Sequence, residues 1–124
     1  MLKRQNPLVR GHVNTYFEWL KSIKPEDIIV GIETGRTLKD AYKEAPYRWR
    51  LAVAMARGFL KASQKYAEQF RQIVRLDLAL LTLKYENPEA YAVIQRYGQK
   101  GVNYLKQCLQ DALEIFGVTG EQKA

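Results

Sequence analysis

Side chains that commonly carry out catalysis or bind metals are few in this sequence, and their spacing joins them into no site. His12 is the only histidine and Cys108 is the only cysteine. Zinc sites and nucleophilic triads need several such side chains held close together, so the sequence predicts neither. We therefore expect no metal and no cofactor, and a protein that is not an enzyme.

One carboxylate stands out because of its apolar neighbours. Asp77 lies between Leu76 and Leu78, near the middle of the apolar side of a predicted helix. A buried carboxylate is costly unless it is paired or protonated, so we expect a structural partner such as His12, an arginine or a tyrosine hydroxyl. No second carboxylate or histidine lies at a spacing that would join Asp77 in catalysis. An enzyme built around Asp77 is therefore the weakest of the functions considered.

Positive charge is the strongest chemical feature of the sequence, and it is concentrated in one segment. Residues 36–75 hold ten basic and three acidic side chains, a surplus of seven that equals the formal net charge of the whole chain. A positive field gathered in one segment favours a polyanionic partner, and above all a nucleic acid. The candidate contact residues are Arg36, Lys39, Lys43, Arg48, Arg50, Arg57, Lys61, Lys65, Arg71 and Arg75.

Six of these cations fall on one side of a helix predicted from about 47 to 86, opposite its apolar residues. Lys61 and Lys65 are like charges four residues apart, a spacing that destabilises a helix by about 0.2–0.5 kcal/mol. Keeping such pairs indicates a use, although a solvated face is the simpler alternative. We expect this stripe to contact the phosphate backbone of DNA or RNA. Its members are Arg50, Arg57, Lys61, Lys65, Arg71 and Arg75.

Residues 29–45 fit a helix-turn-helix pattern, with Gly35 at the turn. In that module the second helix enters the major groove, so the residues that read bases would be Arg36, Thr37, Lys39 and Lys43. Two short helices packed around a glycine turn give the same pattern. The sequence leaves both interpretations open.

Apolar residues recur at helical spacing along most of the chain, which predicts an all-α fold. Between residues 47 and 86 there is no proline and a single glycine, so one long helix is expected there. Asn87 and Pro88 then stop this helix and begin another, which ends near Phe116. The predicted architecture is a helical bundle built on a long antiparallel hairpin (about 47–86 and 88–116), with short N-terminal helices near 13–23, 25–33 and 37–44.

The length of the chain suits one domain with one core. We expect a single helical domain over 12–117, a basic flexible arm over 1–11 and a frayed tail over 118–124. Both long helices carry an apolar seam at heptad spacing, and the second seam contains Gly98 and Gly101, which either admit a close neighbour or divide the helix. Burial of both seams predicts a homodimer. The alternative is a monomer whose short helices cover the exposed seam.

Composition limits the remaining possibilities. No apolar run approaches the ~20 residues of a membrane span, and the first residues lack the apolar core of a signal peptide. A lone cysteine suits a reducing compartment, so we expect a cytoplasmic protein with no membrane partner and no small-molecule substrate. The alternative to nucleic-acid binding is a helical scaffold or adaptor subunit of a larger complex, for example a ribonucleoprotein, that binds an acidic partner.

Overall fold

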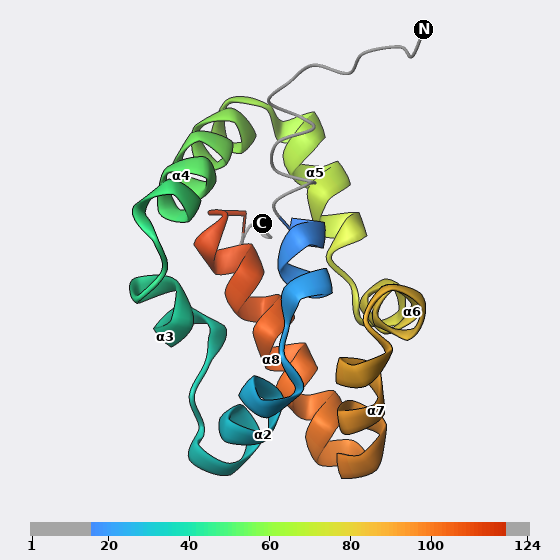
Figure 1. Cartoon of the computed structure of the whole chain (residues 1–124). Helices are drawn as coiled ribbons and strands as arrows, with labels where there is room; N and C mark the ends of the chain where they lie inside the picture. The colour runs from blue at the N-terminus through green and yellow to red at the C-terminus, as the bar shows by residue number, and fades with distance from the viewer. Residues whose placement is uncertain (1–15, 119–124) are drawn as a thin grey trace, which may run out of the picture.

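The structure, a computed structural model, describes residues 16–118, and every regular element in that range is helical (Figure 1). The predicted all-α class is confirmed for this part of the chain. After a helical segment at 16–22 come α2 (Pro25–Thr34), α3 (Leu38–Lys43), α4 (Tyr47–Ala62), α5 (Gln64–Ile73), α6 (Leu76–Glu86), α7 (Pro88–Tyr97) and α8 (Gln99–Ile115).

The ends of the chain bear on two of the sequence predictions. The predicted arm over 1–11 lies outside the described residues, as does His12. Most of the predicted tail over 118–124 lies outside them as well, but its first residue, Val118, is buried. The packed part of the domain therefore extends at least to Val118.

Several helices begin where short-range signals in the sequence place them. Pro25 occupies the first turn of α2, and Gly35 ends that helix with a left-handed φ of 79°. Thr37 and Asp40 form the predicted capping box at the start of α3, because the Thr37 side chain accepts from the Asp40 N–H and the Asp40 carboxylate accepts from the Thr37 N–H. Asn87 caps α7 by accepting from the Ala90 N–H.

α8 is the central helix of the bundle and packs against α2, α3, α6 and α7 (Figure 1). Its buried side includes Leu105, Cys108, Ala112 and Ile115, the apolar seam recognised in the sequence. Helices of this same chain cover that seam. Two of the covering helices, α2 and α3, are among the short helices of the monomer alternative, and the oligomeric state itself stays a prediction.

The predicted long helix over 47–86 is wrong, because three helices occupy this segment. Ser63 leaves helical geometry (φ −132°, ψ 103°), and its hydroxyl accepts from the Tyr66 N–H at 3.3 Å to cap α5. A second break at residues 74–75 separates α5 from α6. A continuous helix of forty residues would span ~60 Å, whereas a domain of ~100 residues has a radius of gyration of about 13 Å. The breaks let Leu60, Phe70 and Leu83 enter one core.

The second arm of the predicted hairpin, 88–116, is also divided. Gly98 has φ 61° and ψ −128° and separates α7 from α8. Gly101 allows the two helices to approach closely, since a Cβ there would lie 2.3 Å from the backbone oxygen of Ile94. Both glycines thus act within the chain, one as a divider and the other as a contact. The predicted long antiparallel hairpin is absent from the described fold.

The expected burial of Asp77 is wrong. Asp77 lies in the first turn of α6, its side chain is exposed, and its carboxylate lies 3.3 Å from the Arg75 guanidinium. The buried carboxylate is Asp111 on α8, which is 0% exposed. Asp111 accepts from the Lys39 N–H at 3.4 Å and from the Gln107 side-chain amide at 3.0 Å. Because the helix breaks before α6, Asp77 lies at a helix start, where the helix dipole stabilises a carboxylate.

Candidate functional site

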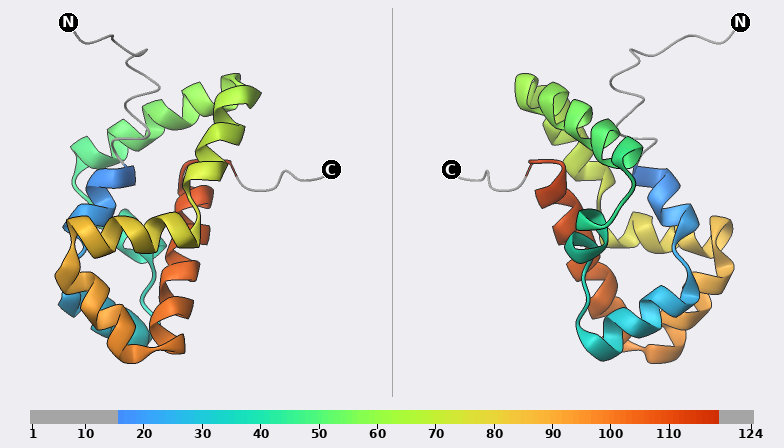
Figure 2. Two further views of the ribbon diagram at one scale, coloured as in Figure 1. Left: turned by 90° about the vertical axis from the view of Figure 1, so that its right-hand side faces the viewer. Right: turned by 60° about the vertical axis from the view of Figure 1, so that its left-hand side comes forward.

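The ten cations singled out in the sequence do not form one stripe. Figure 2 shows α4 and α5 meeting at an angle at one end of the molecule, so the angular positions of a single continuous helix do not apply to both. The helical spacing of Lys61 and Lys65 is lost as well, because α4 ends at Ala62. The cations fall into three groups with different surroundings.

The first group binds the C-terminal end of α8. The Arg57 guanidinium donates to the Ile115 carbonyl at 2.6 Å and to the Glu114 carbonyl at 3.4 Å. The Arg71 guanidinium donates to the Val118 carbonyl at 3.1 Å. Carbonyls at a helix C-terminus lack intrahelical partners and carry partial negative charge. Arg57 therefore attaches α4 to the end of α8, Arg71 attaches α5 to the residues that follow α8, and the first role of both is structural.

The second group lies against carboxylates. Arg36 pairs with Glu44, Lys39 with Glu114, Arg71 with Glu68 and Arg75 with Asp77. Hydrogen bonding to Glu44 raises the pKa of Arg36, and hydrogen bonding to Glu114 raises the pKa of Lys39. The same contact with Arg71 lowers the pKa of Glu68. These pairs are at least partly exposed, so each contributes little stability, but their positive charge is locally balanced.

The surroundings of α3 bear on the helix-turn-helix interpretation. α3 has six residues, Leu38 is buried, and the Lys39 N–H faces Asp111 of α8. The start of α3 is therefore packed against the bundle, and Arg36 and Lys39 are both held in ion pairs. This arrangement favours plain helix packing, the second of the two interpretations left open.

The third group is exposed and has no ion pair among the described residues. It consists of Lys43, Arg48, Arg50, Lys61 and Lys65. Four of these lie within residues 45–67, a segment with five cations and no acid. We call Arg48, Arg50, Lys61 and Lys65 the basic elbow: Lys61 and Lys65 flank the bend between α4 and α5, and Arg48 and Arg50 lie at the other end of α4.

The basic elbow is accompanied by exposed apolar side chains. Tyr47, Leu51 and Met55 recur every four residues on α4 and are 70%, 44% and 56% exposed. The buried side of the same helix carries Val53 and Leu60. The outer face of α4 is thus both apolar and basic, a combination that the charge pattern alone did not indicate.

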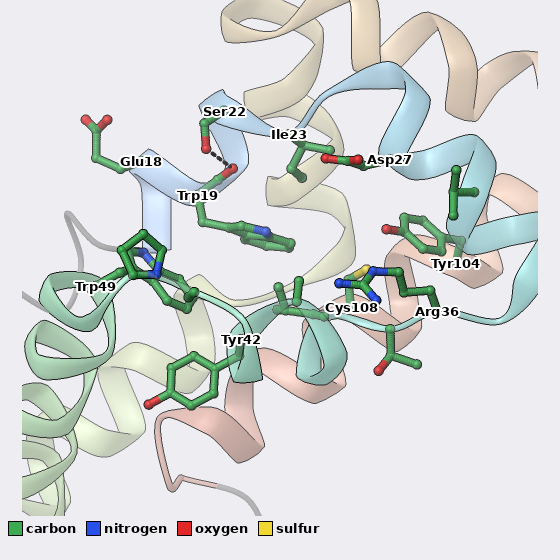
Figure 3. A pocket seen from close by; sticks show the side chains of 16 residues that line it. Glu18, Trp19, Ser22, Ile23, Asp27, Arg36, Tyr42, Trp49, Tyr104 and Cys108 are labelled. Carbon is green, nitrogen blue, oxygen red and sulfur yellow. Dashed lines mark hydrogen bonds between the residues drawn. The ribbon is translucent and has the colours of Figure 1, made fainter.

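A cavity of about 530 Å³ lies between residues 18–23, α2, α3, the start of α4 and α8 (Figure 3). Trp19 projects into its middle, with Trp49 and Tyr42 to one side and Tyr104 to the other. Tyr42 and Trp49 meet edge to face with ring centroids 5.2 Å apart. Sequence reasoning missed this cavity, because its aromatic rings come from four separate elements.

Two ionisable groups of α8 line the cavity. Burial raises the pKa of the Cys108 thiol to about 12, and burial also raises the pKa of the Tyr104 hydroxyl above its usual range. Both groups are therefore neutral at physiological pH. A thiol that stays protonated is a poor nucleophile, so Cys108 offers the cavity no reactive group.

Metal and membrane sites receive no support from the described part of the chain. Within residues 16–118 no three His, Cys, Asp or Glu side chains are grouped so that they could hold a metal ion. None of the helices in that range combines the length and apolarity needed to cross a bilayer.

Comparison with known protein families, with curated proteins and with solved structures finds no match to this chain.

Proposed function

We propose that this chain binds a nucleic acid through the basic elbow. One observation carries the proposal: residues 45–67 hold five cations and no acid, and four of these cations are exposed without an ion pair in the described range. Arg36 and Lys39, by contrast, face carboxylates. A surface whose charge is unbalanced gains most from releasing the counterions of a polyphosphate.

The proposed contact is to the phosphate backbone and so reads little sequence. Four phosphate contacts predict that log Kobs falls with log salt with a slope of about −3.6 for duplex DNA. That slope corresponds to a loss of affinity of about a hundredfold between roughly 50 and 200 mM salt. The exposed ring of Tyr47, beside Arg48, is available to stack on a base, which favours single strands over duplexes.

The test is fluorescence anisotropy with labelled single-stranded DNA, duplex DNA and RNA across a salt series. We expect Lys61→Glu/Lys65→Glu to weaken binding strongly and to reduce the salt slope by about 2. The matched control is Lys100→Glu/Lys106→Glu on the exposed side of α8. Each pair lowers the net charge from +7 to +3, because each reversal removes two units. Equal losses in both variants would show that overall charge, and not the basic elbow, attracts the ligand.

A second candidate is a helical adaptor that binds an acidic protein. It is favoured by the exposed apolar residues Tyr47, Leu51 and Met55, which lie beside the basic elbow and suit an amphipathic helix with acidic edges. The variant Leu51→Ser/Met55→Ser separates the two candidates. It should leave phosphate-backbone binding unchanged but abolish binding to a synthetic acidic amphipathic helix. Nucleic-acid affinity that depends on Leu51 and Met55 would contradict the phosphate-backbone proposal.

Homodimer formation and a cytoplasmic location remain predictions. The apolar seam on α8 is covered within the chain, so a dimer would use exposed apolar residues, those of α4 or Leu78, Leu81 and Tyr85 of α6. Through the outer face of α4, two sets of like charges would meet. Light scattering across a salt series tests this, since screening should promote such a dimer. The cytoplasmic prediction rests on Cys108, a free and buried thiol that suits reducing conditions.

A further inference from the structure

The aromatic cavity has the size and the lining of a small-ligand site. About 530 Å³ falls within the range of known ligand pockets. Four rings line it, those of Trp19, Tyr42, Trp49 and Tyr104, and each ring comes from a different element. Such pockets typically combine apolar walls with a few polar groups that fix the orientation of a ligand.

The charges at the cavity are negative, in contrast to the rest of the molecule. Glu18 and Asp27 both line it. Asp27 has no ion pair within the described residues, and Glu18 lies no closer than 3.9 Å to its partner Lys21. Arg36 is the single cation of the wall, and the Glu44 carboxylate accepts a hydrogen bond from its guanidinium.

The local sequence reinforces this negative charge. Residues 16–34 contain four acidic and two basic side chains, a net charge of −2 in a chain whose total is +7. An anionic ligand would meet two carboxylates at this wall. A neutral apolar ligand would remove the exposed Asp27 from water with only the charge of Arg36, already paired with Glu44, to compensate, which is unfavourable.

We propose that this cavity binds an organic ammonium ion with an apolar body. The cationic end would lie against the ring faces and the Asp27 carboxylate, and the apolar body would fill the space between Trp19 and Trp49. Aromatic faces attract cations through their quadrupole, and ammonium recognition by aromatic groups is a well-known use of that attraction. The cavity adjoins Arg48 and Arg50, because Trp49 lies between them, but none of the four elbow cations lines it, so the proposal goes beyond nucleic-acid binding.

The tryptophans provide a direct assay, because the chain has only two and both line the cavity. The probes are 2-phenylethylammonium, 2-phenylethanol and 3-phenylpropanoate, which share a phenyl body and differ in the charge of the end group. Tryptophan fluorescence should respond to the ammonium ion with an affinity about 3- to 30-fold higher than for the alcohol. 3-Phenylpropanoate should bind most weakly of the three.

Two variants locate the interaction. Asp27→Asn should bring the affinity for the ammonium ion close to that for the alcohol. Glu26→Gln is the matched control, since it removes the same charge from the adjacent exposed residue of α2, which does not line the cavity. Ala41→Phe should fill the cavity and weaken binding of all three probes, with circular dichroism confirming that the helices persist.

Three outcomes would overturn the proposal. One is that no probe changes the tryptophan fluorescence at millimolar concentration. Another is equal or tighter binding of 2-phenylethanol or 3-phenylpropanoate. The third is a loss of ammonium affinity in Glu26→Gln as large as that in Asp27→Asn, which would assign the preference to the general field of α2 and not to the cavity.

Discussion

Arg57 allows a structural role to be separated from a role in ligand binding. The Gly117 and Val118 N–H groups already satisfy the carbonyls of Glu114 and Leu113 at the end of α8, at 3.0 and 2.9 Å. This is the Schellman pattern, with Gly117 in the left-handed region at φ 75°. The next carbonyl, that of Ile115, accepts its hydrogen bond from the Arg57 guanidinium at 2.6 Å.

These contacts determine how much stability the protein should lose when Arg57 is replaced. Hydrogen bonds from charged groups contribute about 1.5–3 kcal/mol, and the partial exposure of Arg57 reduces this to about 1–2 kcal/mol. Arg57→Met keeps much of the side-chain length but removes the donors. In a domain of ~100 residues each kcal/mol shifts Tm by about 4–8 °C, so we expect Tm to fall by roughly 5–15 °C.

The assay compares Arg57→Met with Lys61→Met by thermal unfolding and by nucleic-acid anisotropy. Lys61 is exposed and has no ion pair in the described range, so Lys61→Met should leave Tm nearly unchanged and weaken binding. Arg57→Met should lower Tm and leave binding by the folded protein largely intact. An unchanged Tm for Arg57→Met, together with a loss of binding equal to that of Lys61→Met, would refute the structural role.

Two further predictions concern stability. Gly101→Ala should destabilise the protein by about 1–3 kcal/mol, because the new Cβ would lie 2.3 Å from the Ile94 backbone oxygen. Gly58→Ala should stabilise the protein by about 0.5–1 kcal/mol, because nothing lies within 4 Å of the added atom. Denaturant titration measures both changes, and equal effects would contradict the close approach of α7 and α8. Burial raises the pKa of Cys108 from 9.0 to about 12, so its contribution to stability is complete below pH 9 and is lost as the pH rises toward 12. Unfolding free energy measured from pH 8 upward should therefore decline less steeply in Cys108→Ala than in the parent, and parallel curves would exclude this contribution.

Many local features of the fold could be predicted from the sequence. The start of α2 at Pro25, the Thr37–Asp40 capping box and the Asn87 cap of α7 all depend on groups within four residues of one another. Ser63 carried a comparable signal, because serine is a preferred N-cap, yet the unbroken helical periodicity around it concealed the break. The start of α6 at Arg75 has no side-chain cap, so no such signal marked it.

The candidate site was less predictable. The concentration of positive charge in 36–75 is a property of the sequence, but the partner of each cation is not. Arg57 of α4 reaches a carbonyl 58 residues away, and Lys39 of α3 pairs with Glu114 of α8. The buried carboxylate could not be predicted either. Asp77 has leucine neighbours in the sequence but is exposed, whereas Asp111 is the carboxylate that is buried.

The sequence by itself determined the helical class, the position of several helix ends and the excess of positive charge, because periodicity, capping and composition act over a few residues. The tertiary structure alone decided which cations lack an ion pair among residues 16–118, which carboxylate is buried there and where four aromatic rings line a cavity. The physical reason is that a straight helix over 47–86 would be too long to pack on one compact core, so the chain bends at Ser63 and again before α6. Each bend changes which residues, distant in sequence, become neighbours in space.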